Sequence, residues 1–333
     1  METKQATAIS KLIHWGQSPA ARALAALVLV LLLGVIYNSN GTFFKEVTHT
    51  TALRAMSVFG ILACGMTLVI ITGGIDLSVG SVLALCAVCS AKLAADMQLS
   101  PWIVIPTTLL IGAACGGASG VLTSKLRIQP FIVTLAMMVF ASGLAKHVSG
   151  GMKIPLSQYD DAGNFSRIEW FAALNSRALG DKISVVTIVF LACFVIAYIA
   201  LSRFKWGREL YAIGGNEEAA RLSGVPVVWS KTMAYVASGV FAAIAGLCHA
   251  AQETQGDPEA GVAYELSAIA MVVIGGTSLM GGRGGMGLTL LGILTIGYLE
   301  KILSINFVPE AWRLMLTGAI IVIAVLAQRR GRS

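Results

Sequence analysis

The sequence predicts an all-α integral membrane protein with about ten transmembrane helices. Of its 333 residues, 56% are hydrophobic and only 12% are charged, whereas roughly 25% of the residues in a soluble domain are charged. Apolar runs close to the roughly 20 residues that cross a bilayer recur from residue 22 to the end of the chain. Little sequence remains for a soluble domain, so we expect residues 1–333 to form a single transmembrane domain.

Glycine, proline and charged residues divide the apolar sequence into its spans. Each span holds a run that is long enough, or nearly so, for a helix across the bilayer. The predicted spans lie near 22–40, 52–72, 77–95, 101–123, 128–147, 183–202, 231–251, 264–280, 286–303 and 311–327.

Basic residues predict how the spans are oriented. If residues 1–21 form a retained cytosolic amino terminus, more than half of the 24 Lys and Arg residues fall on the cytosolic side. Most of the 17 acidic residues fall on the opposite side. This asymmetry satisfies the positive-inside rule, so we expect both termini in the cytoplasm. The net charge of +7 then reflects topology and attraction to anionic membrane lipids, and nucleic-acid binding is not needed to explain it.

The sequence lacks patterns typical of catalytic or metal sites. Cys86 and Cys89 have the spacing of half a zinc site, but no second pair or histidine cluster accompanies them. We expect both to pack as small apolar side chains and predict no metal site. No Ser-His-Asp arrangement or paired carboxylates indicate an enzyme, so no catalytic residue is predicted.

Two polar segments are longer than simple turns. The first, 148–182, is expected on the periplasmic side, where its acids, amides and aromatic residues suit either a docking surface or an ordinary connecting loop. The second, 203–230, is expected in the cytosol. It contains Gly214-Gly215-Asn216, a break followed by a residue whose side chain caps helices.

A short helix is predicted directly after this break. Glu217 and Glu218 lie in its first turn, where they are favourable at the positive end of the helix dipole. Gly224 and Pro226 end it, since glycine permits a left-handed exit and proline cannot continue the helix. A helix of about seven residues is marginal alone in water, so it must pack against something. It is either an amphipathic linker on the lipid headgroups or a knob that fits a partner.

Polar residues also interrupt two spans. In "ITGGIDLSVGS", residues 71–81, the Asp76 carboxylate would cost roughly 2.5–3.5 kcal/mol at the bilayer centre. Either the glycines turn the chain at the cytosolic surface and Asp76 caps the next helix, or the break lies deeper and Asp76 faces a water-filled path. The lengths of the adjacent spans slightly favour the shallow turn.

The run "GGTSLMGG" at 275–282 echoes the first break, as an internal duplication or two independent turns would. We predict that both breaks lie on the cytosolic side. The residues predicted for the translocation path or the helix breaks are Gly73, Gly74, Asp76, Ser78, Gly80, Gly275, Gly276 and Ser278.

The run "GGNEEAARLSGV" at 214–225 resembles the coupling-helix region of ATP-binding-cassette (ABC) import permeases, where a Glu-Ala-Ala-type motif docks into the cytosolic ATPase. The runs "GMTLVIITGGIDLSVGSVLAL", "KLRIQPFIVTLAMM" and "ELSAIAMVVIGGTSLMGGRG" resemble the ribose, arabinose, xylose and galactose permease family. The likeness extends over nearly the whole chain. By this resemblance, the residues that couple to the ATPase are Gly215, Asn216, Glu217, Glu218, Ala219, Ala220, Arg221, Leu222 and Gly224.

The resemblance implies a type II ABC importer permease of the bacterial inner membrane. Such a chain pairs as a homodimer, or as a heterodimer with a sister permease, between two ATPase domains and a periplasmic sugar-binding protein. The sequence contains no phosphate-binding Gly-x-x-x-x-Gly-Lys-Ser/Thr loop, so ATP and Mg would be bound by the partner ATPase, and we expect no cofactor in this chain.

We therefore expect a transport subunit for a monosaccharide or a related small polyol. A pentose, a hexose, a polyol and a furanose-like signalling molecule all fit, because the binding protein sets most of the specificity. Two alternatives come from other classes of protein. One is an ion-coupled secondary transporter that uses Asp76 or His249, and the other is a membrane scaffold or receptor without transport.

Overall fold

Ten long or apolar helices form the body of the molecule in the computed structural model, which describes residues 18–159, 165–178 and 180–330. Most of the predicted amino-terminal segment 1–21 and the last three residues, 331–333, lie outside the described residues. The ten helices are α2 (Pro19–Ile36), α3 (Glu46–Ile71), α4 (Val79–Ala95), α5 (Pro101–Ser124), α6 (Pro130–Ser149), α8 (Val185–Arg203), α11 (Val227–Glu253), α12 (Tyr264–Ile274), α13 (Met286–Ile305) and α14 (Glu310–Arg330).

These helices match the predicted spans one for one. Within the described residues, seven are long and apolar enough to cross a membrane, and α4 and α12 are shorter apolar helices. The predicted span 264–280 is wrong at its end, because α12 stops at Ile274. Gly275 and Gly276 follow, and Gly276 has a φ of +106° that few other residues adopt.

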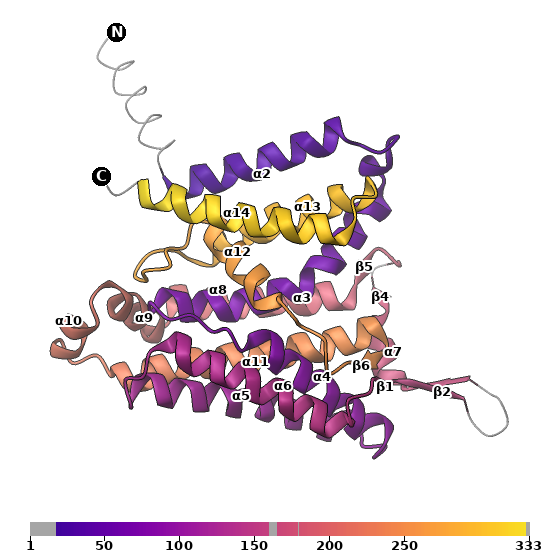
Figure 1. Ribbon diagram of the computed structural model, residues 1–333, viewed down its shortest axis with the longest axis horizontal. Coiled ribbons are helices and arrows are strands. Elements are labelled where there is room, and N and C mark those ends of the chain that lie inside the picture. The colour runs from indigo at the N-terminus through magenta and orange to yellow at the C-terminus, as the bar shows by residue number, and fades with distance from the viewer. Residues whose placement is uncertain (1–17, 160–164, 179, 331–333) are drawn as a thin grey trace, which may run out of the picture.

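Short elements lie at the two ends of the bundle (Figure 1). At one end are α9 (Lys205–Gly215) and α10 (Glu217–Leu222), and we call this the α10 end. At the other, which we call the hairpin end, β2 (Ser157–Tyr159) pairs antiparallel with β3 (Phe165–Arg167). The remaining short elements are η1 (Thr42–Phe44), α7 (Glu169–Asn175), and the antiparallel pairs of β1 (Ile154–Pro155) with β6 (Gln255–Gly256) and β4 (Arg177–Ala178) with β5 (Ile183–Ser184).

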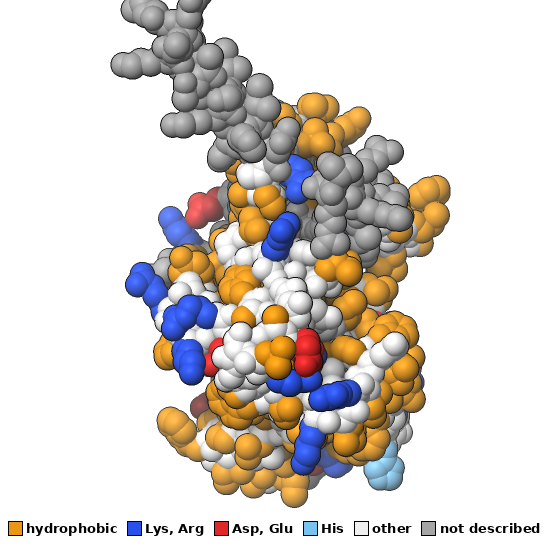
Figure 2. Space-filling view, turned by 90° about the vertical axis from the view of Figure 1, so that its left-hand side faces the viewer, with side chains coloured by type: hydrophobic (Ala, Val, Ile, Leu, Met, Phe, Trp, Pro, Cys, Tyr) orange, Lys and Arg blue, Asp and Glu red, His pale blue; other side chains and the backbone are white. Residues whose placement is uncertain are grey.

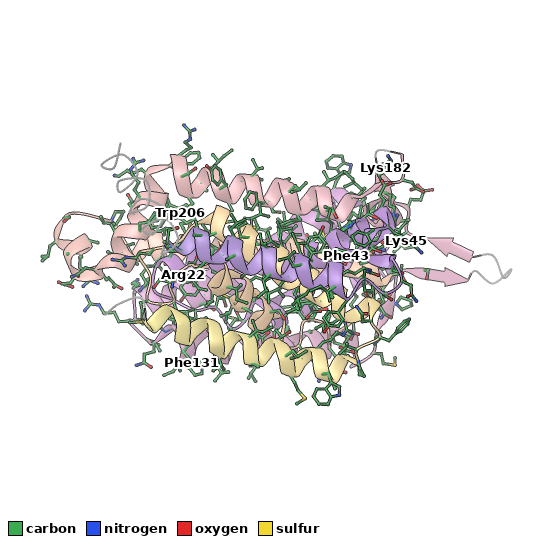
Figure 3. All side chains as sticks on the ribbon, turned by 90° about the horizontal axis from the view of Figure 1, so that it is seen from above. Arg22, Phe43, Lys45, Phe131, Lys182 and Trp206 are labelled. Carbon is green, nitrogen blue, oxygen red and sulfur yellow. The ribbon has the colours of Figure 1, made fainter. Side chains whose placement is uncertain are left out.

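The core lies around α3, α4 and α11, which are buried along most of their length. Helices α2, α5, α6, α8 and α14 surround them and expose large apolar side chains. Figure 2 looks at the α10 end, where Lys and Arg side chains gather between apolar flanks. From above, Arg22 and Trp206 lie toward this end, whereas Phe43, Lys45 and Lys182 lie at the hairpin end (Figure 3). Apolar flanks with charged ends are what a bilayer-spanning bundle requires.

A glycine repeat brings α5 and α11 into close contact. Gly112, Gly116 and Gly120 recur every four residues and therefore share one face of α5. A Cβ at Gly116 would lie 2.1 Å from the carbonyl oxygen of Tyr235 on α11. Small residues at this spacing let membrane helices approach backbone to backbone.

Candidate functional site

The predicted cytosolic segment contains two helices rather than one. Residues 205–215 form α9, so Gly214-Gly215 ends a helix instead of lying in a loop. The indole N–H of Trp206 donates to the carbonyl oxygen of Ser230 at 3.2 Å. The Ser230 hydroxyl in turn donates to the Glu209 carboxylate at 2.6 Å. These two bonds fix α9 to the start of α11.

The short helix α10 follows where the sequence predicts it. The side-chain oxygen of Asn216 accepts a hydrogen bond from the N–H of Ala219 at 3.0 Å, which confirms the predicted cap. Ala220 is buried against apolar side chains of α9 and α11. Leu222, in contrast, is 82% exposed. The helix is thus anchored on one side and presents an apolar tip on the other.

Ion pairs hold the charges of α10. Arg221 pairs with Glu217 at 3.1 Å and with Glu218 at 3.0 Å. Lys231, on α11, also reaches Glu217 at 2.9 Å. Ion pairs as exposed as the two of Arg221 contribute roughly 0.2–1 kcal/mol each, whereas Lys231 is buried. They orient α10 on α11 more than they stabilise it.

The first break has one feature of each predicted alternative, a turn at one end of the bundle and a deeply placed Asp76, but Asp76 contacts protein groups rather than a water-filled path. Helix α3 ends at Ile71 at the α10 end, and Gly73, with a φ of +78°, turns the chain. The next residues run back without helical structure to the middle of the bundle, where α4 begins at Val79 (Figure 1). Non-helical backbone at membrane depth is tolerated where protein buries it or water reaches it.

Asp76 lies deep in this returning segment and is only 1% exposed. One of its carboxylate oxygens accepts from the N–H of Ser78 at 3.0 Å and from the Ser78 hydroxyl at 2.6 Å. The other accepts from the hydroxyl of Ser238 at 2.8 Å. Ser238 lies eleven residues into α11, which begins at Val227, about 16 Å along the helix axis. Asp76 therefore ties the start of α4 to the middle of α11.

The second break connects α12 to α13 at the α10 end. Gly275 packs against α13, where an added Cβ would lie 2.2 Å from the carbonyl oxygen of Leu288. The N–H of Ser278 donates to the carbonyl oxygen of Arg283 at 3.0 Å and closes the loop. Both breaks therefore turn at the same end of the bundle.

Four glycines from three distant segments meet between the breaks and α9. We call Gly73, Gly214, Gly281 and Gly282 the glycine junction. The N–H of Gly282 donates to the carbonyl oxygen of Ile71 at 2.9 Å. A Cβ at Gly214 would lie 1.8 Å from that same oxygen and 2.4 Å from the nitrogen of Gly282. A Cβ at Gly281 would lie 2.7 Å from the nitrogen of Gly73.

A tyrosine of α9 strengthens this contact. The Tyr211 hydroxyl donates to the carbonyl oxygen of Gly284 at 2.9 Å. Burial raises the pKa of this hydroxyl, so it stays protonated and remains a donor. The end of α9 is thus joined to the end of α3 and to the loop after α12.

The two short helices begin beside each other inside the bundle. A Cβ at Gly80, in the first turn of α4, would lie 2.2 Å from the carbonyl oxygen of Gly261 and 2.6 Å from the Glu265 carboxylate in the first turn of α12. Helix α4 then runs to the hairpin end and α12 to the α10 end (Figure 1). Paired broken helices of this kind are typical of transporters, whose binding sites they form.

The predicted site residues fall into two groups in space. Gly73 and Gly214-Gly215 lie with the second break at the α10 end. Asp76, Ser78 and Gly80 lie in the middle of the bundle. Neither α9, the glycine junction nor the glycine repeat of α5 was predicted from the sequence. The repeat alone is visible there, as G-x-x-x-G-x-x-x-G.

A many-span helical bundle with two broken helices and an exposed short helix at one end defines the class as a membrane transport protein. The comparisons name the family. Residues 48–325 match the family model described as branched-chain amino acid transport system / permease component, and the chain belongs to this family. It is therefore a multi-pass transport subunit rather than an enzyme.

Relatives cover nearly the full chain. The ribose import permease protein of Haemophilus influenzae is 39% identical over 301 residues, which is 90% of this chain and 91% of the relative. The ribose import permease protein of Escherichia coli K12 is 36% identical over 304 residues, 91% of this chain and 92% of the relative. The fructose import permease protein of Rhizobium meliloti is 36% identical over 324 residues, 96% of this chain and 88% of the relative. No solved structure matches.

Proposed function

We propose that this chain is the transmembrane permease of an ATP-driven, binding-protein-dependent importer that carries a monosaccharide or a related small polyol across the bacterial inner membrane. The glycine junction carries the proposal. It joins α10, through the end of α9, to both helix breaks. The names of the relatives, which are ribose and fructose import permeases, supply the class of cargo.

In this mechanism α10 is the docking element for a cytosolic ATPase. Its exposed Leu222 tip enters the ATPase, and its capped, ion-paired body transmits the motion of the ATPase to α9. ATP and Mg are bound by that partner. Movement of α9 shifts the end of α3 and the loop after α12 together, because all of them meet at the glycine junction.

This assignment makes the α10 end cytosolic and the hairpin end periplasmic. The basic side chains gathered at the α10 end support it, since cytosolic segments are enriched in Lys and Arg (Figure 2). Both termini are then cytoplasmic, and the segment 148–182 faces the binding protein. The chain acts as one domain and pairs with a second permease copy, for which we propose a homodimer.

Asp76 has a structural place in this mechanism. Its carboxylate accepts three hydrogen bonds, and among the described residues no basic side chain pairs with it. An ion-coupled transporter would instead use Asp76 to bind and release a cation. The hydrogen bonds of Asp76 hold the start of α4 against α11, and we propose that this contact stays fixed while the broken helices move.

The role of α10 is tested by replacing the apolar residue at its tip, Leu222, with an acidic one. Leu222→Asp should abolish co-purification of the ATPase, because a carboxylate replaces the apolar contact. Leu126→Asp is the matched control, since Leu126 is 59% exposed in the connection between α5 and α6. It should leave the complex intact. If the ATPase stays bound and sugar-stimulated in Leu222→Asp as in the control, α10 is not the coupling helix.

A further inference from the structure

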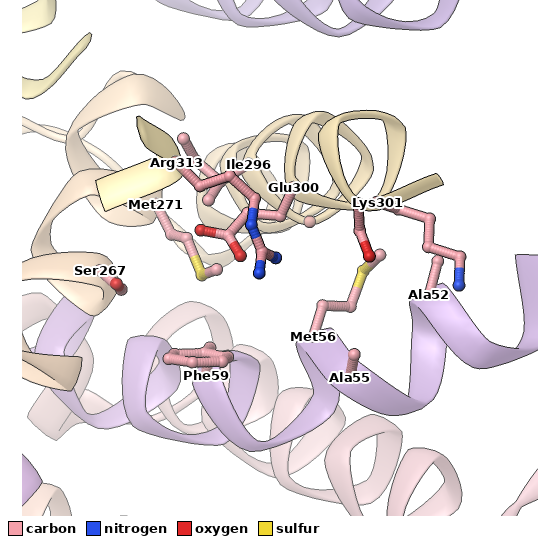
Figure 4. Close-up of a pocket in the computed structure, with 12 residues that line it drawn as sticks. Ala52, Ala55, Met56, Phe59, Ser267, Met271, Ile296, Glu300, Lys301 and Arg313 are labelled. Carbon is pink, nitrogen blue, oxygen red and sulfur yellow. The ribbon is translucent and has the colours of Figure 1, made fainter. Parts of the chain in front are cut away.

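A cavity at the hairpin-end half of the bundle lies apart from the breaks and from α10. It is enclosed by α3, α12, α13 and α14 and has a volume of about 160 Å³ (Figure 4). One water needs roughly 10–15 Å³ of such space, whereas drug-sized ligands occupy pockets of roughly 300–1,000 Å³. The cavity therefore matches a ligand of a few polar groups around one small ring.

Two opposite charges face this cavity without pairing directly. Glu300 of α13 and Arg313 of α14 both point into it (Figure 4). They attract each other electrostatically, but within the described residues no ion pair joins them. The Nε of Arg313 is buried, with no hydrogen-bond partner among those residues. Polar groups in this condition are costly in a membrane protein unless something else satisfies them.

The neighbouring lysine does not supply the missing contact. The ammonium group of Lys301 donates to the hydroxyl of Thr51 at 2.9 Å, which directs it away from Glu300 and toward α3 (Figure 4). The Glu300 carboxylate can therefore still accept hydrogen bonds from a ligand, and the Arg313 guanidinium can still donate them. Their charges have opposite sign, so together they favour a neutral ligand over an ion.

An aromatic ring lies across the cavity from these charges. Phe59 of α3 faces Glu300 and Arg313 (Figure 4). Tyr264 packs against Phe59 with the ring centroids 4.4 Å apart, so the ring is held in place. Ser267 adds a hydroxyl at the wall. A sugar ring has an apolar C–H face that packs on the phenyl ring. Its hydroxyls form hydrogen bonds with planar charged groups, and one carboxylate or guanidinium can bind two of them at once.

We propose that this cavity is a binding site for a single monosaccharide, occupied as the sugar passes from the periplasmic side into the permease. The proposal rests on the proposed function, since it takes sugar import as given. Weak binding is the useful kind here, because a site that held its cargo tightly would slow release. The competing ligand is a zwitterionic amino acid, whose ammonium group would meet Glu300 and whose carboxylate would meet Arg313.

The test measures protection of a cysteine placed in the wall. Ser267→Cys is introduced into the permease, which is purified in complex with its ATPase, reconstituted in vesicles and supplied with its binding protein. Its reaction with a maleimide is followed with D-ribose, D-fructose or L-leucine at millimolar concentration. Ser142→Cys is the control, because Ser142 lines a different hollow between α4 and α6. The unmodified chain gives the background from its six native cysteines.

We expect a sugar to slow labelling of Ser267→Cys and to leave the control unchanged. Adding Glu300→Gln should weaken that protection by about tenfold, the effect of one lost charge-assisted hydrogen bond. Glu310→Gln, an exposed acid outside the cavity lining, should not. Phe59→Leu should weaken protection, and Phe140→Leu on the outer surface of α6 should not.

Two results would overturn the proposal. Protection by L-leucine but by neither sugar would assign the cavity to an amino acid. No protection by any of the three, in vesicles that take up sugar with ATP, would exclude the cavity as a sugar site while leaving the import function standing. Vesicles that take up no sugar at all would instead count against the proposed function, so uptake is measured on the same preparation.

Discussion

Gly214→Ala places a methyl group into the glycine junction, where the backbone leaves no room for it. The new Cβ would lie 1.8 Å from the Ile71 carbonyl oxygen and 2.4 Å from the nitrogen of Gly282. Both neighbours are backbone atoms, and they share a 2.9 Å hydrogen bond that must lengthen. Overpacking costs about 1–3 kcal/mol and the lost hydrogen bond about 0.5–1.5 kcal/mol, so we expect about 2–4 kcal/mol of strain.

The adjacent glycine is the matched control. A Cβ at Gly215 would meet nothing within 4 Å, so Gly215→Ala makes the same chemical change one residue away without strain. If the Gly214→Ala strain is about 1.4 kcal/mol larger in one end state of the transport cycle than in the other, the equilibrium between the two states shifts about tenfold. The assay is sugar taken up per ATP hydrolysed in vesicles that contain permease, ATPase and binding protein.

We expect Gly214→Ala to keep its ATPase and to lose sugar uptake per ATP, while Gly215→Ala matches the unmodified protein. Co-purification of the ATPase shows that α10 is still folded and docked. Equal uptake per ATP in the two variants would refute the glycine junction as the mechanical link, even if Gly214→Ala were less stable.

Three further predictions concern packing, the buried carboxylate and pH. Gly116→Ala should lower the free energy of unfolding by about 1–3 kcal/mol, because its Cβ would lie 2.1 Å from a carbonyl oxygen of α11. Gly117→Ala is the control, since its Cβ would contact only a valine methyl at 3.5 Å. Equal thermal unfolding of the two variants in detergent would contradict this prediction. Asp76→Asn should leave uptake ATP-dependent but reduce thermal stability, because an NH2 group, which cannot accept a hydrogen bond, replaces one of the two accepting carboxylate oxygens. If uptake instead loses its response to an ion gradient, the carboxylate carries an ion. Burial raises the pKa of Asp257, but hydrogen bonds from Lys153 and from a backbone N–H outweigh it and hold the pKa below its ordinary value. That contribution to stability is present above the ordinary pKa of about 3.9 and is lost as the pH falls through the lower, folded-state pKa. Asp257→Asn should therefore be less sensitive to acid in thermal unfolding, and an unchanged acid response would exclude the pair as a contributor.

The spans could be predicted because apolar length is a local property of the sequence. The same is true of the α10 cap, where Asn216 follows two glycines and precedes two acids, and the predicted bond to Ala219 is present. The end of α12 could not be placed from hydropathy. Val272 and Ile274 look like the middle of a longer span, and the helix stops where the backbone of Gly276 turns.

Contacts between distant residues were beyond the sequence. Nothing local to Gly73, Gly214 or Gly282 indicates that they meet, because each pair of glycines reads as an independent turn. Glu300 and Arg313 are also unremarkable in sequence, where they read as charges near the ends of two spans. Only the packing of α12 against α13 and α14, and of α13 against α3, turns them toward one cavity (Figure 4). Likewise, hydropathy alone shows α4 as a full span, although it begins in the middle of the bundle.

We propose that ATP drives sugar through this chain by way of α10. This proposal is tested most directly by uptake of radiolabelled D-ribose and D-fructose into vesicles that contain the permease, its ATPase and its binding protein, with ATP on the α10 side. We predict uptake of at least one of these sugars that requires ATP and continues when ionophores collapse every ion gradient. Uptake without ATP that stops when the gradients collapse would exclude an ATP-driven importer and establish an ion-coupled transporter.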